Sequence, residues 1–362
     1  MAIKLKPLRD QVIVITGASS GIGLATAHAA AKKGARLVLA ARNGEALHHI
    51  MQQINGMGGE AIYVTADVGR QQDVQHIAEA ALHHFGGFDT WINDAGVSVY
   101  GRLDEVSDED NRRLFDTNFW GTVYGSQMAA MHLRQRGGAI INIGSVTSDV
   151  AMPMQGMYSA SKHAVKGFTD ALRIELEEDG APVSVTLIKP AAINTPFPEH
   201  ARNYTNNRLT LPPPVYEPEE VAKAILHAAT HQKRDIIVGG GGKLMSATNK
   251  LAPGLMDLAN ETFMTDQQLL DEAPLNREGT LYSPGEGGRV RGHIKDTMKT
   301  SLYTRAVTNP VITGAVVAAA SAAAIALAGR NRKKKPSSRP EVVEAVEVIE
   351  RVDAPLPPQR PL

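Results

Sequence analysis

The chain has 362 residues, 43% of them hydrophobic, and its 38 basic and 38 acidic residues give a formal net charge of zero. This length exceeds one α/β domain of about 250 residues, so we expect such a domain with a C-terminal extension, and neutrality argues against a nucleic-acid partner. The absence of cysteine excludes disulfides, thiol catalysis and thiolate metal sites, and the twelve histidines form no ligand-like cluster, so we expect no metal. No signal peptide precedes the first predicted strand, so we expect a cytoplasmic catalytic domain.

A glycine-rich turn separates the first predicted strand, residues 12–16, from a helix-forming run at residues 24–33 that Gly34 ends. Without bulky side chains, such a turn lets a pyrophosphate reach the free N–H groups and the positive dipole end of the helix. The pattern predicts a dinucleotide site, although a plain tight turn is the alternative. Its candidate cofactor contacts are Gly17, Ser19, Ser20, Gly21, Ile22 and Gly23.

The end of the next predicted strand, residues 36–41, indicates which dinucleotide is bound. An acidic residue here would hydrogen-bond the adenosine ribose of NAD, but the chain has Arg42 instead. Arginine can pair with the 2′-phosphate of NADP through a planar, charge-assisted contact. We therefore expect NADP in preference to NAD, with a solvated loop arginine as the alternative.

Two more predicted strands, residues 61–65 and 90–92, are followed by small or polar residues. Ligands bind at the C-terminal ends of parallel strands, so these residues are candidate cofactor contacts. Ordinary turn chemistry is the alternative, because Asn, Asp and Gly favour turns. The candidates are Asp67 and Val68 after the first strand and Asn93, Ala95 and Gly96 after the second.

Tyr158 and Lys162 are the candidate catalytic pair. They stand four residues apart in a segment, residues 158–176, whose apolar positions have helical periodicity, so both lie on one helix face. A phenol titrates near about 10, and the positive charge of the lysine favours its anion. We therefore predict that Lys162 brings the pKa of Tyr158 toward the working pH, as general acid–base catalysis requires.

Two polar residues complete the candidate catalytic set. Ser145 follows a predicted strand at residues 139–143 and can hydrogen-bond a substrate oxygen. It lacks a Gly-x-Ser-x-Gly elbow and an evident histidine base, so we predict a polarising role for Ser145, not a nucleophilic one. Asn118 lies in a helix-like run, residues 113–126, where asparagine has low propensity; it is either functional or a satisfied helical side chain.

In order and spacing, these motifs resemble the short-chain dehydrogenase/reductase family: Thr-Gly-Ala-Ser-Ser-Gly-Ile-Gly at residues 16–23, Asn-Asp-Ala-Gly at residues 93–96, then Asn118, Ser145, Tyr158 and Lys162. The resemblance spans residues 8–240. It departs from the family at Asp94, where the family has Asn, and at Ala191, where Gly is common. It implies an α/β Rossmann-type doubly wound parallel sheet with helices on both faces, and an NAD(P)-dependent oxidoreductase acting on CH–OH or C=O groups.

The resemblance also implies roles for single residues. Asn118 would hold a water that links Lys162 to solvent, and Tyr158 and Lys162 would also contact the cofactor. Thr195 would contact the nicotinamide carboxamide, and Pro190 and Ile193, nearby, join the cofactor-binding set. The family also implies a homo-oligomer.

The stretch at residues 196–216 is rich in Pro and Asn with few regular signals, which indicates a mobile substrate loop. Apolar residues near the predicted site suggest a hydrophobic carbonyl or alcohol substrate, with plain packing as the alternative. They are Val97, Val99, Tyr100, Met152, Met154, Phe197 and Leu209. The glycines at residues 239–242 are not a phosphate loop, because Leu244 stands where Ser or Thr is required; they allow an exit from a strand at residues 235–238.

Four segments are predicted along the chain: an NAD(P)-binding domain at residues 1–250, a helical and irregular extension at 251–309, a candidate membrane helix at 310–329, and a basic then Pro-rich, disordered tail at 330–362. Residues 311–328 carry no charge and would extend about 27 Å as a helix, close to the roughly 30 Å of a hydrocarbon core. We predict membrane association, with a soluble Ala-rich helix as the alternative. An interfacial position would keep the catalytic domain on the cytosolic side.

Two function classes follow. The first is an NADP-dependent oxidoreductase for a hydrophobic carbonyl or secondary alcohol, with Tyr158 as general acid/base. The second is a membrane-associated dinucleotide-binding scaffold or sensor with vestigial catalysis. The intact set of four candidate catalytic residues favours the first, because a pure binder has no need of them.

Overall fold

The computed structural model describes residues 3–308 and residue 313. Residues Met1–Pro310 form one compact unit and Val311–Leu362 a second. The predicted membrane helix and the C-terminal tail lie outside the described residues, apart from residue 313. Within the described part of the chain, no helix is long and apolar enough to cross a membrane. The boundary predicted at residue 250 lies inside the first unit and stays a prediction.

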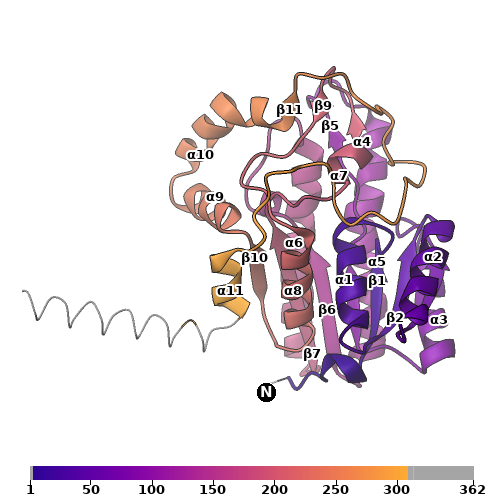
Figure 1. The fold of residues 1–362 in the computed structure, drawn as a ribbon. Helices are drawn as coiled ribbons and strands as arrows, with labels where there is room; N and C mark the ends of the chain where they lie inside the picture. Colours follow the sequence, from indigo (N-terminus) through magenta and orange to yellow (C-terminus); the bar gives the residue numbers. More distant parts are fainter. Residues whose placement is uncertain (1–2, 309–312, 314–362) are drawn as a thin grey trace, which may run out of the picture. The chain divides into compact units, whose positions relative to one another are not determined.

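A seven-stranded parallel sheet forms the centre of the first unit, in the order β3-β2-β1-β4-β6-β7-β10 (Figure 1). The chain order reverses between β1 and β4, which makes this a doubly wound sheet with its switch point beside β1 and confirms the predicted fold class. The strands are β1 (Val12–Thr16), β2 (Arg36–Ala41), β3 (Glu60–Thr65), β4 (Thr90–Asn93), β6 (Gly138–Ile143), β7 (Val183–Pro190) and β10 (Asp235–Val238).

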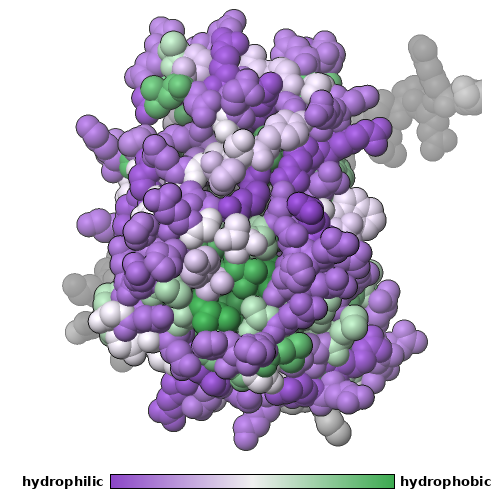
Figure 2. Space-filling view, turned by 90° about the vertical axis from the view of Figure 1, so that its right-hand side faces the viewer, coloured by the Kyte–Doolittle hydropathy of each residue, from purple (hydrophilic) through white to green (hydrophobic). Residues whose placement is uncertain are grey.

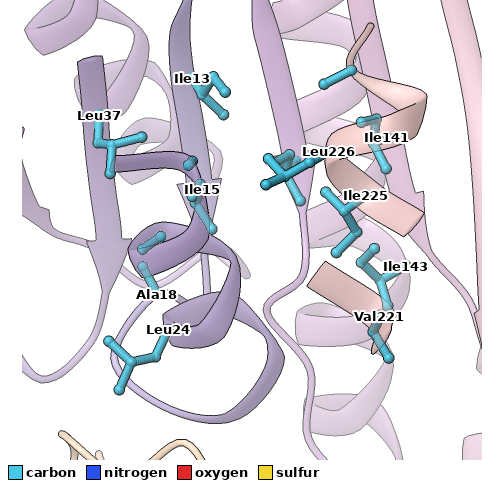
Figure 3. Packing of buried hydrophobic residues seen from close by; sticks show 14 of the residues in the cluster. Ile13, Ile15, Ala18, Leu24, Leu37, Ile141, Ile143, Val221, Ile225 and Leu226 are labelled. Carbon is cyan, nitrogen blue, oxygen red and sulfur yellow. The ribbon is translucent and has the colours of Figure 1, made fainter. Parts of the chain in front are cut away.

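Helices cover both faces of the sheet. On one face α1 (Gly21–Ala31), α2 (Gly44–Gly56) and α8 (Pro218–Ala228) share a buried cluster with strand residues such as Ile13 and Ile15. On the other face α3 (Gln71–Phe85), α5 (Gly121–Leu133) and α6 (Gly156–Glu178) pack on the alternate strand residues. Figure 3 shows part of the first cluster, with labelled side chains from β1, β2 and α1 on one side of the view and from β6 and α8 on the other. Burial on both faces explains why the strands read as continuous apolar runs.

The edge strand β3 differs from the central strands, because Ala61 alone of its six residues is fully buried and Glu60, Tyr63 and Thr65 are exposed. Figure 2 shows this side of the molecule as largely hydrophilic around one apolar area. Polar and charged residues at a sheet edge discourage pairing with another chain.

The helical run expected around Asn118 is interrupted. Helix α4 (Asp108–Phe115) ends in a π-helical turn, Asp116–Trp120, before α5 begins at Gly121. Ser107 caps α4 by accepting a hydrogen bond from the Asp110 amide. The wider π turn contains Asn118, and such turns occur frequently at functional sites.

The stretch expected to be an irregular loop after β7 contains short elements. Helix α7 (Phe197–His200) is followed by β8 (Arg202–Asn203), which pairs with β5 (Val99–Tyr100). Then β9 (Arg208–Leu209) pairs with β11 (Leu269–Leu270) of the extension. These elements are short and their pairing partners are distant in sequence, and the role of this stretch as a mobile substrate loop stays a prediction.

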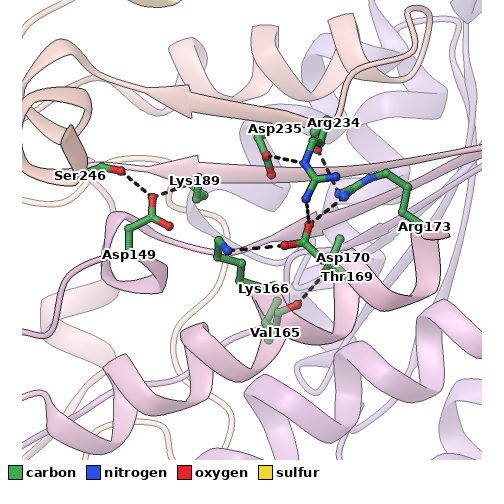
Figure 4. Close-up of polar contacts among 10 residues, drawn as sticks. All are labelled: Asp149, Val165, Lys166, Thr169, Asp170, Arg173, Lys189, Arg234, Asp235 and Ser246. Atoms are coloured by element: carbon green, nitrogen blue, oxygen red, sulfur yellow. Dashed lines mark hydrogen bonds and ion pairs between the residues drawn. The ribbon is translucent and has the colours of Figure 1, made fainter. Parts of the chain in front are cut away.

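The extension packs on the same unit. Helix α9 (Gly240–Leu251) begins after Gly239, whose φ of 104° allows the sharp exit expected there. A break separates it from the next helix, because Pro253 starts α10 (Pro253–Ala259). Figure 4 shows one link to the sheet: the Asp149 carboxylate accepts hydrogen bonds from Lys189 of β7 and Ser246 of α9, each at 2.7 Å. Helix α11 (Leu302–Thr308) follows a long irregular stretch.

Candidate active site

The glycine-rich turn lies where the sequence predicted it, between β1 and α1. Gly17 has a φ of 72°, and a Cβ on it would lie 2.8 Å from the Ala95 amide nitrogen. A Cβ on Gly23 would lie 2.4 Å from the Gly17 carbonyl oxygen. Glycine is required at both positions, because the turn, the first turn of α1 and the chain after β4 approach one another so closely.

A cavity of about 470 Å³ opens at the C-terminal ends of the strands, beside this turn. Most of the predicted site residues meet in its wall, although they come from the ends of six strands and from helix α6. They are Gly17, Ser19, Ser20, Gly21, Ile22, Arg42, Asp67, Val68, Ala95, Gly96, Ser145, Tyr158, Lys162, Pro190, Ile193 and Thr195.

Three predicted site residues are outside the wall of this cavity. Gly23 lies behind the turn, next to Gly17 and Asp94. Asn93 is buried at the end of β4, where its amide nitrogen donates to the Asn142 side chain at 2.8 Å and so joins β4 to β6. Asn118 is fully buried in the π turn.

Tyr158 and Ser145 form the polar centre of the cavity. Tyr158 is buried at the start of α6, and its phenol is hydrogen-bonded to the Ser145 hydroxyl. Burial raises the pKa of Tyr158, the Ser145 hydrogen bond opposes this rise, and the nearby Asp94 charge adds to it. The Ser145 oxygen also accepts from the Thr147 amide at 3.1 Å, which fixes its position.

Lys162 lies on the same face of α6 as Tyr158, as expected, with its Nζ 5.7 Å from the centre of the Tyr158 ring. Its ammonium donates to the carbonyl of Ile143 at 2.8 Å. The expected lowering of the Tyr158 pKa by Lys162 is wrong for this structure, because burial of the phenol outweighs every other influence. Burial also lowers the pKa of Lys162, to about 8, and the Asp94 carboxylate opposes that fall.

The Asn118 side chain is occupied by the chain after β4. Its Oδ1 accepts from the Val97 amide at 2.8 Å, and its Nδ2 donates to the Val97 carbonyl at 2.9 Å. Oδ1 of Asn118 and Nζ of Lys162 both approach Gly96, where an added Cβ would lie 3.5 and 3.8 Å from them. Asn118 therefore holds the loop beside Lys162, and its role in a water relay stays a prediction.

Asp94 was not among the predicted site residues, yet it lies in the cavity wall near the glycine turn and Lys162. Its carboxylate accepts a hydrogen bond from the Gly23 amide. Burial raises the pKa of Asp94 to about 7, while Lys162 and that hydrogen bond oppose the rise. The signal in the sequence was the replacement of the family asparagine by an acid.

Arg42 lies in the cavity wall at the end of β2, and the C-terminal extension contacts it. Its guanidinium donates hydrogen bonds to the backbone carbonyls of Thr280 and Leu281. The second carbonyl also accepts from Nε of Arg113, whose Nη2 donates to Asp67 at 2.5 Å. No local signal in the sequence indicated that residues near 280 would reach this strand end.

The other end of the cavity is largely apolar. Of the side chains predicted to line it, Val97, Tyr100, Met152 and Phe197 do so. The other three do not: Val99 and Met154 line a separate small pocket, and Leu209 packs against Tyr100. Helix α9 and the extension supply wall residues that the sequence did not predict, namely Leu244 and Met245 of α9 and Met264 and Gln268 of the extension.

Comparison with known proteins agrees with this geometry. A family model described as short chain dehydrogenase matches residues 11–205. The "Uncharacterized oxidoreductase YxnA" of Bacillus subtilis (strain 168) is 48% identical over 321 residues, covering 87% of this chain and 90% of that protein. The 11-beta-hydroxysteroid dehydrogenase A of Sesamum indicum is 37% identical over 187 residues, covering 51% and 53%.

Solved structures show the same fold. A short chain dehydrogenase/reductase from Burkholderia phymatum in complex with NAD has a TM-score of 0.60 at 28% identity, covering 75% of this chain and all of that one. An alcohol dehydrogenase from Thermococcus sibiricus, complexed with 5-hydroxy-NADP, has a TM-score of 0.56 at 27% identity, covering 63% and 95%. The chain belongs to the short-chain dehydrogenase/reductase family and is an NAD(P)-dependent oxidoreductase of that type.

Proposed function

We propose that this protein moves a hydride between the nicotinamide of NADP and a hydrophobic carbonyl or secondary alcohol, with Tyr158 as the general acid/base. The observation that carries the proposal is the hydrogen-bonded pair of Tyr158 and Ser145 in one cavity, between a glycine turn and an apolar wall. One end of the cavity thus suits a dinucleotide and the other an apolar substrate.

The residues beside β1 fit a dinucleotide. Gly17 and Gly23 let the turn pack closely against the chain after β4, where a Cβ would collide. A turn of this kind places the N-terminus of α1 at the cavity, where a pyrophosphate would bind. Ser19, Ser20 and Ile22 line this end of the cavity and would hold the phosphates. Thr195 lies opposite, within 3.3 Å of the place where a Cβ on Gly21 would stand, and would hold the carboxamide. When bound, the nicotinamide supplies or accepts the hydride.

The protein's own groups handle the proton. The Ser145 hydroxyl donates to the substrate oxygen, which polarises a carbonyl or orients an alcohol. In reduction, Tyr158 gives its phenolic proton to that oxygen; in oxidation, its phenolate takes the proton back. The Lys162 ammonium is held by the Ile143 carbonyl near the Tyr158 ring, and its charge favours the phenolate that forms during reduction.

The cofactor preference for NADP rests on Arg42. The guanidinium lies at the end of β2, where an adenosine ribose would sit, and no acid takes this place. A hydrophobic substrate is supported by the methionine and leucine side chains that α9 and the turn after α10 add to the wall.

We also infer that the chain associates with a membrane and forms a homo-oligomer. The uncharged residues 311–328 support the membrane, as do large apolar side chains of α9 and α10 that stay exposed, including Leu251 at 84% and Leu255 at 60%. Membrane pellets washed with high salt and then alkaline carbonate would test this, with a chain ending at residue 310 as control. Release of the full chain by salt alone contradicts an inserted segment. Light scattering of the purified chain tests the oligomer.

The test of the proposed reaction is NADPH oxidation against a panel of hydrophobic aldehydes and ketones, for wild type and Tyr158→Phe. We expect turnover by the wild type and a loss of about 10²–10⁴-fold in kcat for the variant, because only the proton donor is removed. NADPH binding by both proteins without turnover by either supports the scaffold or sensor instead.

A further inference from the structure

The irregular stretch before α11 crosses the dinucleotide end of the cavity. In Figure 1 the orange segment between β11 and α11 passes the N-terminal end of α1 before it returns to α11. Within it, Thr280, Pro284, Gly285 and Glu286 line the same cavity as Ser19 and Arg42. Because an open volume remains beneath them, these residues cover the groove without filling it.

The stretch is fixed at its first end by a buried side chain. Leu281 is fully buried and clusters with Leu114 and Phe197. The Tyr282 hydroxyl next to it donates to Asp110 at 2.8 Å. Removing Leu281 from this cluster would expose its whole side chain to water, so this end stays in place when neighbouring residues move.

The second end is fixed by Asn194, which follows β7 and precedes the predicted nicotinamide contact Thr195. The Asn194 side chain donates to the Ile294 carbonyl at 3.0 Å and accepts from the Ile294 amide at 3.3 Å. The Gly292 amide donates to the Asn194 carbonyl at 3.3 Å. The two hydrogen bonds between the Asn194 side chain and the Ile294 backbone hold the chain at this point.

Between these ends lies a span, residues 283–291, which we call the strap. Polar bonds hold it to the glycine turn and its surroundings. The Gly288 amide donates to the Ser19 carbonyl at 2.8 Å, and the Gly21 amide donates to the Arg289 carbonyl at 2.9 Å. The Asn43 side chain donates to the Gly285 carbonyl at 2.8 Å, outside the turn.

The strap can leave the groove without unfolding the domain. Five of its nine residues are exposed, and it contains three glycines, which lower the barrier to backbone rearrangement. Its side chains form ion pairs with the domain, Arg289 with Glu199 at 2.7 Å and Arg291 with Glu217 and Glu219 at 2.5 Å each. The partly buried Val290 also packs against the core. Water can replace the ion pairs at small net cost, unlike the buried contacts at either end.

We propose that the strap closes over the bound dinucleotide, so that the cofactor enters and leaves only when residues 283–291 lift. This rests on the proposed use of the groove by a nicotinamide dinucleotide. Substrate reaches Tyr158 from the apolar end, which the strap does not cover. Cofactor exchange is then slower than substrate exchange and limits turnover when the cofactor must be replaced.

A reversible lock tests this directly, because the natural chain contains no cysteine. A Cβ on residue 287 would lie 3.6 Å from the Ser19 Cβ, within the roughly 3.5–4.5 Å that disulfides span. It would also lie 2.3 Å from the Ala46 Cβ, so the variant is Ser19→Cys, Ala46→Gly, Gly287→Cys. The control with one thiol is Ser19→Cys, Ala46→Gly. Thiol titration reports whether the bond has formed.

The experiment measures the release of NADPH and of NADH. Excess oxidised cofactor is added to the complex, and the loss of the fluorescence of the bound reduced cofactor reports its release. We expect that oxidising the triple variant with cofactor bound slows cofactor release by at least about 100-fold. A reductant should restore the original rate. The one-thiol control keeps one rate in both conditions. Equal cofactor release rates from the oxidised and the reduced triple variant overturn the proposal.

A second variant covers the case in which the disulfide does not form. Glu199→Gln weakens the ion pair with Arg289 while keeping the shape of the side chain, so release should become several-fold faster at low salt. Asp104→Asn removes a more exposed ion pair, with Arg102, outside the cavity wall, and should leave the rate unchanged. Identical rates for Glu199→Gln and wild type count against the strap. A protein that binds neither cofactor contradicts the proposed function itself, which separates the two failures.

Discussion

The guanidinium of Arg42 donates a hydrogen bond of 3.0 Å to the backbone carbonyl of Leu281, 239 residues later in the chain. Arg42 stands at the end of β2, where we propose that it selects NADP, and Leu281 anchors the strap. The C-terminal extension therefore contributes directly to the environment of Arg42.

Arg42→Ala should show whether this side chain binds the 2′-phosphate of NADP or only holds the C-terminal extension. We expect the affinity for NADPH to fall by about 10–100-fold, the worth of a charge-assisted contact with phosphate, while NADH affinity changes little. Titration of protein fluorescence with each cofactor measures this, with Arg102→Ala as a surface control. An equal loss for both cofactors would mean that Arg42 acts by holding the extension and not by binding a 2′-phosphate.

The rate of the chemical step should fall on the alkaline side near pH 8. Burial lowers the pKa of Lys162 to about 8, and only its charged form favours the phenolate of Tyr158. Asp94 opposes that lowering, so Asp94→Asn should move the alkaline limb to lower pH. A pH profile of kcat for both proteins measures the shift. A limb that stays in place excludes Lys162 as the titrating group coupled to Asp94.

Asp94 should also make stability depend on pH. Its folded pKa is raised to about 7 from 3.8, chiefly by burial, so the folded state favours the protonated form. That contribution is complete below about pH 4 and is lost as pH rises through about 7. Asp94→Asn does not titrate. We expect the difference in Tm between wild type and variant to shift in favour of the variant from pH 5 to pH 8. A difference that is constant with pH contradicts the assignment.

A surface charge cluster on α6 should matter for stability and not for the reaction. Asp170 accepts from Arg173 at 2.7 Å and from Arg234 at 2.9 Å, and Lys166 lies at 3.5 Å (Figure 4). Arg173 is nearly buried, so Asp170→Ala leaves its charge poorly compensated. We expect a loss of about 1–3 kcal/mol in the free energy of unfolding, with kcat unchanged at 25 °C.

The matched control for that prediction is Asp179→Ala, which removes an ion pair with Arg134 whose two side chains are about half exposed. Such a pair contributes about 0–1 kcal/mol, so the control should unfold close to wild type in urea. A cost for Asp179→Ala equal to that for Asp170→Ala would contradict the role given to burial.

Local patterns were enough to predict the core of the fold. The β-branched run of β1, the glycines after it and the spacing of Tyr158 and Lys162 each depend on residues that are close in sequence. Backbone geometry alone sends alternate strand residues to the two faces of the sheet and places residues four apart on one face of a helix. It also lets glycines form a turn without side chains. These elements were accordingly in the predicted places, within a few residues at their ends.

Other features depended on contacts that no local pattern contains. The interruption of the helix at Asn118 was missed because a π turn has the same composition as an α-helix. The stretch after β7 looked irregular because its strand partners, β5 and β11, lie about 100 and 60 residues away. Tyr158 was expected to have a lowered pKa from its spacing to Lys162, whereas the burial that raises it comes from many elements packed together.

The amino-acid sequence by itself determined the doubly wound sheet, the glycine turn and the identity of the candidate catalytic set, because each is encoded within a single strand, turn or helix. Only the tertiary structure decided that Asp94 lies beside Lys162 in the cavity wall, and that residues 283–291 cross the groove to meet Ser19, Gly21 and Asn43. Burial and long-range backbone bonds depend on the path of the whole chain, so a pattern of neighbouring residues cannot specify them.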